Sequence, residues 1–177
     1  ALGKRLVVAT DLTASAWRLD SPAPMVQTPA GPVRPEVAVL DAPQMQRLRG
    51  IHQLGTAYYV YPSAQHSRFE HCLGACAMAK RIVAELERGG FEMDSVERDA
   101  VFLAALAHDV THIPFGHTFE DERKLLGRHD LSAERFTFFL GESELGRILE
   151  GSEAGRLAKE IIRPDHPMPA GKGYLRQ

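Results

Sequence analysis

The chain has 177 residues, of which 44% are hydrophobic and 25% are charged, and its formal net charge is −2 at pH 7. This length can bury a substantial core, and the composition is ordinary for a globular domain in water. The near-neutral charge argues against broad binding to nucleic acids or membrane surfaces, but it leaves room for a local basic pocket that binds one phosphorylated small molecule. No apolar run reaches the 18 residues of a membrane span.

The two cysteines, Cys72 and Cys76, lie one helical turn apart. We expect them to face the core as reduced thiols, which favours a cytoplasmic protein. No second cysteine pair is present to complete a zinc site. The chain begins with Ala and stops at YLRQ without a helix-ending signal, so we expect it to be part of a longer protein.

Residues 1–35 are expected to form an extended N-terminal segment, and residues 36–177 a single domain. LVVAT, at residues 6–10, predicts a short edge strand. The stretch from Ser21 to Pro35 contains five prolines and predicts an extended loop.

Residues 36–54 predict a helix that is interrupted near Pro43. We expect Asp41 to cap the second part and Gly55 to end it. Apolar residues recur at helical spacing and predict a core face: Met45, Leu48 and Ile51.

Two arginines of this helix, Arg47 and Arg49, are left for the surface or for a site. Residues 56–67, TAYYVYPSAQHS, are aromatic and predict extended structure before a turn at Pro62. We expect three tyrosines to pack in the core or at a sheet edge: Tyr58, Tyr59 and Tyr61.

Residues 67–88 give the clearest helical pattern in the chain. Ser67 and Glu70 predict a capping box, and Gly89-Gly90 predicts the end of the helix. One apolar stripe is expected to face the core: Phe69, Cys72, Leu73, Cys76, Val83 and Leu86.

A second helix, capped by Asp94 or Ser95, carries a strongly apolar run that ends in His108-Asp109. His112 follows one turn later, before Pro114 breaks the helix. Imidazole and carboxylate groups at the end of a buried helix are costly unless something binds them, and a divalent metal accepts both. The alternative is a helix C-terminus whose histidines interact with the helix dipole.

The remaining residues also predict helices. A charged run, DERK, precedes His129-Asp130 and an amphipathic stretch near Phe136. Residues 141–162 predict one or two short helices, and residues 163–173 predict a loop that includes His166. The fold predicted from these patterns is all-α.

A lone histidine on one helix followed by an adjacent His-Asp pair on a later helix resembles the HD-domain metal phosphohydrolases. Two long segments, residues 46–75 (QRLRGIHQLGTAYYVYPSAQHSRFEHCLGA) and 108–120 (HDVTHIPFGHTFE), resemble motifs of the deoxynucleoside-triphosphate triphosphohydrolase branch. The resemblance covers roughly residues 36–130. It implies an HD-domain helical bundle with a divalent metal held between two central helices.

The resemblance also implies site residues. Three residues would hold a divalent metal ion: His71, His108 and Asp109. The resemblance leaves open whether the metal is Mn, Mg, Fe, Co, Ni or Zn. Arg68 would bind a phosphate of the substrate, and Gln53 and Leu54 would lie against its sugar and base. His112 and His117 would contact the phosphates or protonate the leaving group, and Glu120 would orient one of these histidines. His129 would be a further phosphate-binding or proton-transfer residue.

In that branch the whole triphosphate is removed and a deoxynucleoside remains, so we expect a nucleotide ligand, and a homo-oligomer is compatible with the resemblance. Thr111 and Ile113 stand where the family has glycines, which leaves open another nucleotide or phosphoester as substrate. The family's fourth ligand, an aspartate, is expected beyond Gln177. Without it, a catalytically inactive nucleotide-binding or regulatory module is the remaining alternative.

Overall fold

The computed structural model of the protein describes residues 25–28, 31–163 and 167–176. Within these ranges the chain is helical apart from one hairpin, which confirms the all-α prediction. The strand expected at residues 6–10 and His166 lie outside the described residues. None of the described helices combines the length and apolar character needed to cross a membrane.

The hairpin pairs β1 (Val26–Thr28) with β2 (Gly31–Val33) in antiparallel register, and Val26 lies opposite Val33. The sequence predicted only a loop here. Pro32 is tolerated in this hairpin because both strands of a two-stranded sheet are edge strands.

The first helical region is broken where the sequence predicted, but it ends earlier. α2 (Pro35–Asp41) and α3 (Pro43–Gln46) are separated by Ala42, whose extended backbone is the conformation that a following proline favours. Asp41 does not cap α3, because Ala42 occupies the N-cap position and makes no side-chain hydrogen bond.

A 3-10 turn (Arg47–Gly50) completes this region, so Gly55 does not end a helix as predicted. Gly55 instead lies in the following turn with a φ of 55°, a conformation that glycine adopts without strain. The three apolar residues predicted as a core face are buried: Met45, Leu48 and Ile51.

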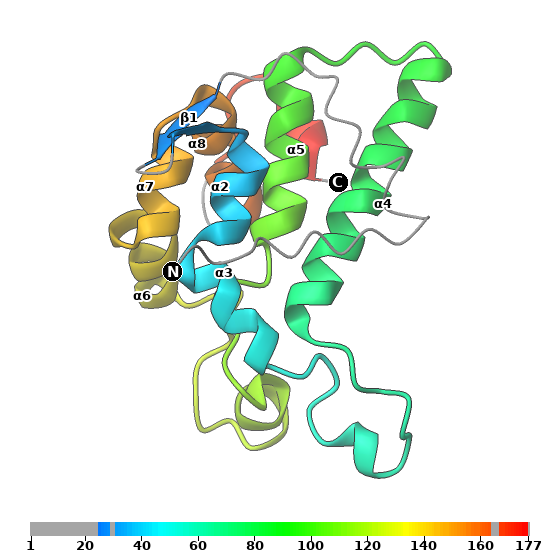
Figure 1. Ribbon diagram of the computed structural model, residues 1–177, viewed down its shortest axis with the longest axis vertical. Helices are drawn as coiled ribbons and strands as arrows, with labels where there is room; N and C mark the ends of the chain where they lie inside the picture. The colour runs from blue at the N-terminus through cyan, green and yellow to red at the C-terminus, as the bar shows by residue number, and fades with distance from the viewer. Residues whose placement is uncertain (1–24, 29–30, 164–166, 177) are drawn as a thin grey trace.

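The tyrosine-rich segment forms a short 3-10 turn (Ala57–Tyr59) and further turns rather than extended structure. Tyr59 and Tyr61 are 76% and 66% exposed, so their predicted packing in a core or at a sheet edge is wrong. The segment projects from the lower end of the helical bundle, away from the β1–β2 hairpin (Figure 1).

α4 (Arg68–Arg88) begins at the predicted capping box: the Ser67 hydroxyl accepts from the Glu70 N–H, and the Glu70 carboxylate accepts from the Ser67 N–H. Of its predicted stripe, Leu86 is 45% exposed and Leu73 is half-buried. α4 and α5 diverge towards the connection that joins them, which leaves Leu86 outside the core (Figure 1). The other four residues are buried: Phe69, Cys72, Cys76 and Val83.

α5 (Ser95–Ala107) is the central helix, and it packs against α2, α4 and α8. Asp94, one of the two predicted caps, is its N-cap and forms a capping box with Glu97. Its apolar run is largely buried, from Ala100 to Ala107. The chain then turns away from the helix axis before it reaches Pro114.

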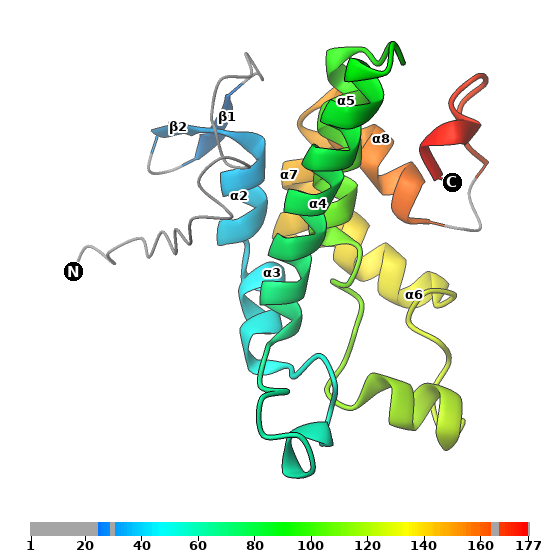
Figure 2. The ribbon, with the colours of Figure 1, turned by 90° about the vertical axis from the view of Figure 1, so that its right-hand side faces the viewer.

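Shorter elements follow α5 in the chain: the first, at residues 118–122, lies below the bundle, and later ones complete it (Figure 2). Two π-helical turns (Thr118–Glu122 and Thr137–Glu142) flank α6 (Ala133–Phe136). α7 (Glu144–Glu150) and α8 (Glu153–Ile162) are the two short helices predicted within residues 141–162. A final 3-10 turn (Gly173–Arg176) follows.

Candidate metal centre and active site

The candidate site lies where the start of α4 meets the end of α5. The two helices are joined at their far ends, so they run in opposite directions and approach each other at the lower end of the bundle (Figure 1). The first turn of α4 carries Arg68 and His71, and the residues after α5 are His108 and Asp109. The capping box therefore fixes the helix start that presents half of the site.

Three side chains have the spacing of groups that share one ion: His71, His108 and Asp109. The Nε2 atoms of the two histidines are 3.2 Å apart, and the Asp109 carboxylate oxygens lie 3.8 Å from His71 Nε2 and 3.3 Å from His108 Nε2. Donors bonded at about 2.1 Å to one ion stand about 3.0–3.4 Å apart. The predicted convergence is observed, and ion binding by these residues stays a prediction.

The protonation states suit a cation. Nδ1 of His108 donates to the Ala105 carbonyl oxygen at 2.9 Å, so the Nε2 lone pair is free to face the other two groups. Burial lowers the pKa of His71, which favours the neutral imidazole that metals bind. Burial alone would raise the pKa of Asp109, but His108, His112 and Arg68 outweigh it and lower the pKa.

Arg68 is only 3% exposed, and its Nη1 donates to Asp109 Oδ2 at 2.8 Å. The guanidinium therefore supplies a buried positive charge beside the carboxylate. The sequence predicted Arg68 as a phosphate contact, and the structure places it against a candidate metal ligand. Both roles are compatible with its several donors.

His112 and His129 form the second part of the site. His112 is 2% exposed, and its Nε2 lies 3.5 Å from Asp109 Oδ1. Its ring stacks on His129 with centroids 3.4 Å apart and planes inclined by 29°. Asp109 and these two histidines are close enough to hold an ion. However, imidazole lone pairs lie in the ring plane, so two stacked rings are poorly placed to share one.

Glu120 is fully buried and orients His129. Its carboxylate accepts from the backbone N–H and the Nδ1 of His129, at 2.9 and 2.7 Å, and from Nη1 of Arg135. Burial by itself would raise the pKa of Glu120, but these hydrogen bonds lower it to about 2. Sequence reasoning missed Arg135, because a single basic residue in an amphipathic stretch gives no local sign of a distant carboxylate.

His117 lies at the edge of this group. Its side chain is exposed, its Nδ1 is 2.9 Å from an Asp121 carboxylate oxygen, and its ring is 5.1 Å from that of His112. Gly116 makes this approach possible, because a Cβ there would stand 3.1 Å from His112 Nδ1.

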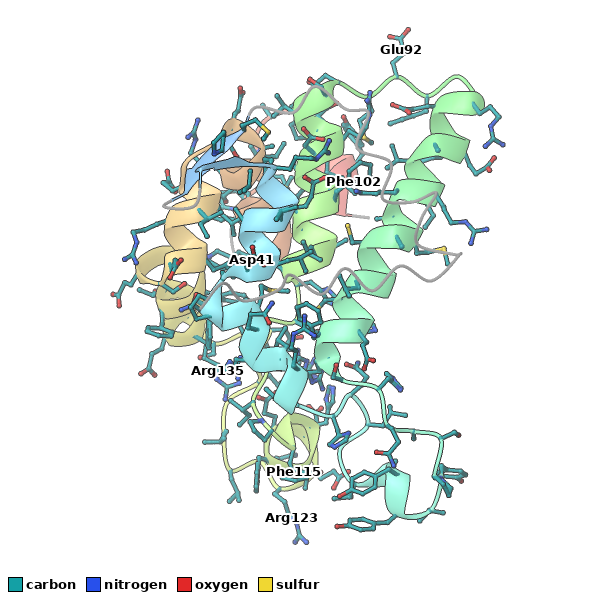
Figure 3. The ribbon with its side chains drawn as sticks, viewed as in Figure 1. Asp41, Glu92, Phe102, Phe115, Arg123 and Arg135 are labelled. Carbon is teal, nitrogen blue, oxygen red and sulfur yellow. The ribbon has the colours of Figure 1, made fainter. Side chains whose placement is uncertain are left out.

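Gln53 and Leu54 belong to the turn before α4. A β-bridge between His52 and Ser67 ties this turn to the start of the helix, and Leu54 is exposed. A Cβ at the neighbouring Gly55 would be 3.9 Å from the ring of Phe115, which lies at the lower end of the molecule in Figure 3. The turn thus lies near Phe115, in the segment between the site histidines, and its substrate role stays a prediction.

Comparison with known proteins decides the family. The sequence profile of the HD domain matches residues 68–175, well over half of the chain. The chain belongs to the HD domain family. The resemblance inferred from the two motifs is therefore confirmed, and with it the HD-type fold.

Among relatives of this HD domain, deoxynucleoside triphosphate triphosphohydrolase SAMHD1 from Gallus gallus is 41% identical over 123 residues, which cover 64% of this chain and 20% of that protein. SAMHD1 from Homo sapiens is 48% identical over 86 residues, covering 48% of this chain and 14% of that protein. The uncharacterized protein YwfO of Bacillus subtilis is 40% identical over 114 residues, covering 63% and 25%. The chain thus spans a quarter or less of the length of these relatives.

Solved structures agree with the fold. A hypothetical protein from Aquifex aeolicus has a TM-score of 0.64 and 30% identity, with 86% of this chain and 40% of that chain covered. A phosphohydrolase from Bacteroides thetaiotaomicron has a TM-score of 0.61 and 29% identity, with 81% and 35% covered.

Proposed function

We propose that this HD domain is a metal-dependent phosphohydrolase that converts deoxynucleoside triphosphates to a deoxynucleoside and triphosphate. The observation that carries the proposal is the short spacing of His71, His108 and Asp109 beside Arg68. The names of the SAMHD1 relatives, deoxynucleoside triphosphate triphosphohydrolases, support the choice of substrate and product. We take residues 36–177 as the HD unit and residues 1–35 as a segment that precedes it.

His71, His108 and Asp109 would hold the ion, which when bound would supply charge neutralisation at phosphate oxygens and an activated water. Arg68 would keep Asp109 ionised and offer further N–H donors to a phosphate. The bound ion, together with Arg68, would supply the positive charge that a polyphosphate substrate requires.

The histidines would handle protons and orientation. Glu120 accepts the Nδ1–H of His129, which directs the Nε2 of His129 away from the carboxylate and leaves it free for proton transfer. Burial lowers the pKa of His112 to about 3, so its neutral imidazole would act as a hydrogen-bonding group. His117, exposed at the edge, would meet the outer phosphates, and Gln53 and Leu54 would lie against the nucleoside.

The decisive experiment incubates the full chain with Mn²⁺ and each of the four deoxynucleoside triphosphates, and identifies the products by ion-exchange chromatography. We expect triphosphate from at least one substrate, and loss of that product in Asp109→Asn. Asp130→Asn is the matched control, because Asp130 also follows a histidine but pairs with Arg128 at the surface. Absence of triphosphate from every substrate, or full activity in Asp109→Asn, would contradict the proposal.

Another nucleotide or phosphoester is the second candidate. The specific observation is the bulk of Thr111 and Ile113 between the site histidines; Thr111 is almost fully buried and Ile113 partly so. Release of pyrophosphate or orthophosphate in place of triphosphate would favour this candidate. Metal and nucleotide binding without any product would favour a regulatory module.

A further inference from the structure

One side chain outside the candidate ligands reaches directly into the turn that carries them. Arg47 lies in the 3-10 turn after α3, and its Nη2 donates to the backbone carbonyl oxygen of Val110 at 2.6 Å. The two residues are 63 positions apart. Val110 is fully buried and directly follows Asp109.

The Val110 carbonyl lies in the turn that follows α5. α5 stops at Ala107, and the chain continues through turns in which Val110 N–H donates to Ala107 and His112 N–H donates to Asp109. A carbonyl group beyond the end of a helix is outside the helical hydrogen-bond pattern and needs another partner. A buried carbonyl without a hydrogen bond is costly, and Arg47 supplies that bond.

The surroundings of Arg47 make this an expensive position for a cation. Burial, with a smaller effect from the charge of Arg135, lowers the pKa of Arg47. The guanidinium lies over the ring of Phe139 at 4.9 Å, which offsets part of the lost hydration. A partly buried guanidinium placed against a fully buried backbone carbonyl is well suited to fix a turn.

We propose that Arg47 is a positioning residue that holds the 107–112 turn, and through it His108 and Asp109, in the arrangement that binds metal. Arg47 acts through the Val110 carbonyl and does not itself contact the ion. The inference rests on the proposed metal site. The hydrogen bond from Arg47 to Val110 also joins the two motif segments, residues 46–75 and 108–120, by a direct contact.

Arg49 provides a matched comparison from the same 3-10 turn. Its side chain is directed elsewhere, since its Nε donates to Gln46 Oε1 at 2.7 Å and its guanidinium lies 3.9 Å from the centroid of the Phe69 ring. Replacement of Arg49 removes the same charge without touching the 107–112 turn.

The test compares Arg47→Met, Arg47→Lys and Arg49→Met in the full chain. Amide hydrogen exchange of the metal-free proteins, measured by mass spectrometry, should rise in peptides covering 107–112 for Arg47→Met alone. The Mn²⁺ dissociation constant, from the electron paramagnetic resonance signal of free Mn²⁺, should rise about 10- to 100-fold in Arg47→Met. Arg47→Lys keeps a donor and should restore most of both properties, while Arg49→Met should resemble the wild type.

Unchanged exchange in residues 107–112 of Arg47→Met, or equal effects in Arg47→Met and Arg49→Met, would overturn the inference. If Arg47→Met does not fold, Arg47→Gln replaces it, because the glutamine side chain is too short to reach Val110. Arg47→Gln should show the same rise in exchange and the same weaker Mn²⁺ binding. A wild-type chain that binds no Mn²⁺ would defeat the proposed function, and the exchange comparison would still decide the role of Arg47.

Discussion

At the scale of single residues, Asp109 is the group on which the others depend. Its carboxylate lies within 4 Å of a buried guanidinium and three imidazoles. Such a carboxylate is stable in a protein interior only with compensating charge nearby. Arg68 provides that charge in the structure, and a bound cation would provide more.

The Arg68–Asp109 pair leads to a prediction about stability. Arg68→Met should lower the free energy of unfolding by about 3–5 kcal/mol, because it leaves a buried carboxylate without its partner. Mn²⁺ should raise the melting temperature more in Arg68→Met than in the wild type, since the ion replaces the missing charge. Calorimetry with and without Mn²⁺ measures both effects. Arg81→Met, at an exposed position of the same helix, should change little.

Glu120 leads to a prediction about acid stability. The pKa of Glu120 is lowered from an ordinary 4.5 to about 2, so its contribution is complete above pH 4.5 and is lost as the pH falls towards 2. The unfolding free energy of the wild type should therefore fall more steeply over this interval than that of Glu120→Gln. Urea unfolding at a series of pH values measures the slopes, and equal slopes would contradict the assignment. Glu134→Gln, exposed on α6, should keep the wild-type slope.

At the scale of elements, two helix ends define the site, and they are controlled differently. The start of α4 is set locally by the hydrogen bonds between Ser67 and Glu70. The end of α5 is followed by a turn that a distant side chain, Arg47, caps at Val110. A local cap is visible in the sequence, whereas a distant one requires the fold.

The cap of α4 leads to a third prediction. Ser67→Ala should destabilise the protein by about 1 kcal/mol, because the Glu70 N–H loses its acceptor. Fraying of the first turn would also displace Arg68 and His71, so Mn²⁺ binding should weaken. Chemical denaturation and a metal titration test the two effects. Ser95→Ala is the control, because Asp94 rather than Ser95 caps α5.

At the scale of the whole molecule, the short helices α7 and α8 pack against each other, and α8 also packs against α5. Gly155 in α8 permits the close approach, since a Cβ there would stand 2.0 Å from the carbonyl oxygen of Leu149. Because α8 packs against α5, this contact also bears on how the central helix is held.

This contact leads to the fourth prediction. Gly155→Ala should lower the unfolding free energy by about 3 kcal/mol, because α7 and α8 must separate. Gly74→Ala is the matched comparison on α4, where an added Cβ meets no atom within 4 Å. That change should stabilise the protein by about 0.5–1 kcal/mol through the helix propensity of alanine. Thermal unfolding of both variants shows whether the change in stability is negative for Gly155→Ala and positive for Gly74→Ala.

Features that depend on neighbouring residues could be predicted from the sequence. The Ser67–Glu70 capping box, the buried run that ends at His108-Asp109 and the break at Pro43 follow from helix periodicity and backbone chemistry, which act over a few residues. The two motifs are long enough to indicate the HD family from the sequence.

Contacts between distant groups could not be predicted from the sequence and follow from the folded arrangement. The pairing of Glu120 with Arg135, the contact of Arg47 with Val110 and the exposure of Tyr59 involve packing between segments far apart in the chain. Neither propensity nor spacing encodes such contacts, because burial and charge pairing act through space rather than along the sequence. The proposed boundary at residue 35 stays a prediction for the same reason.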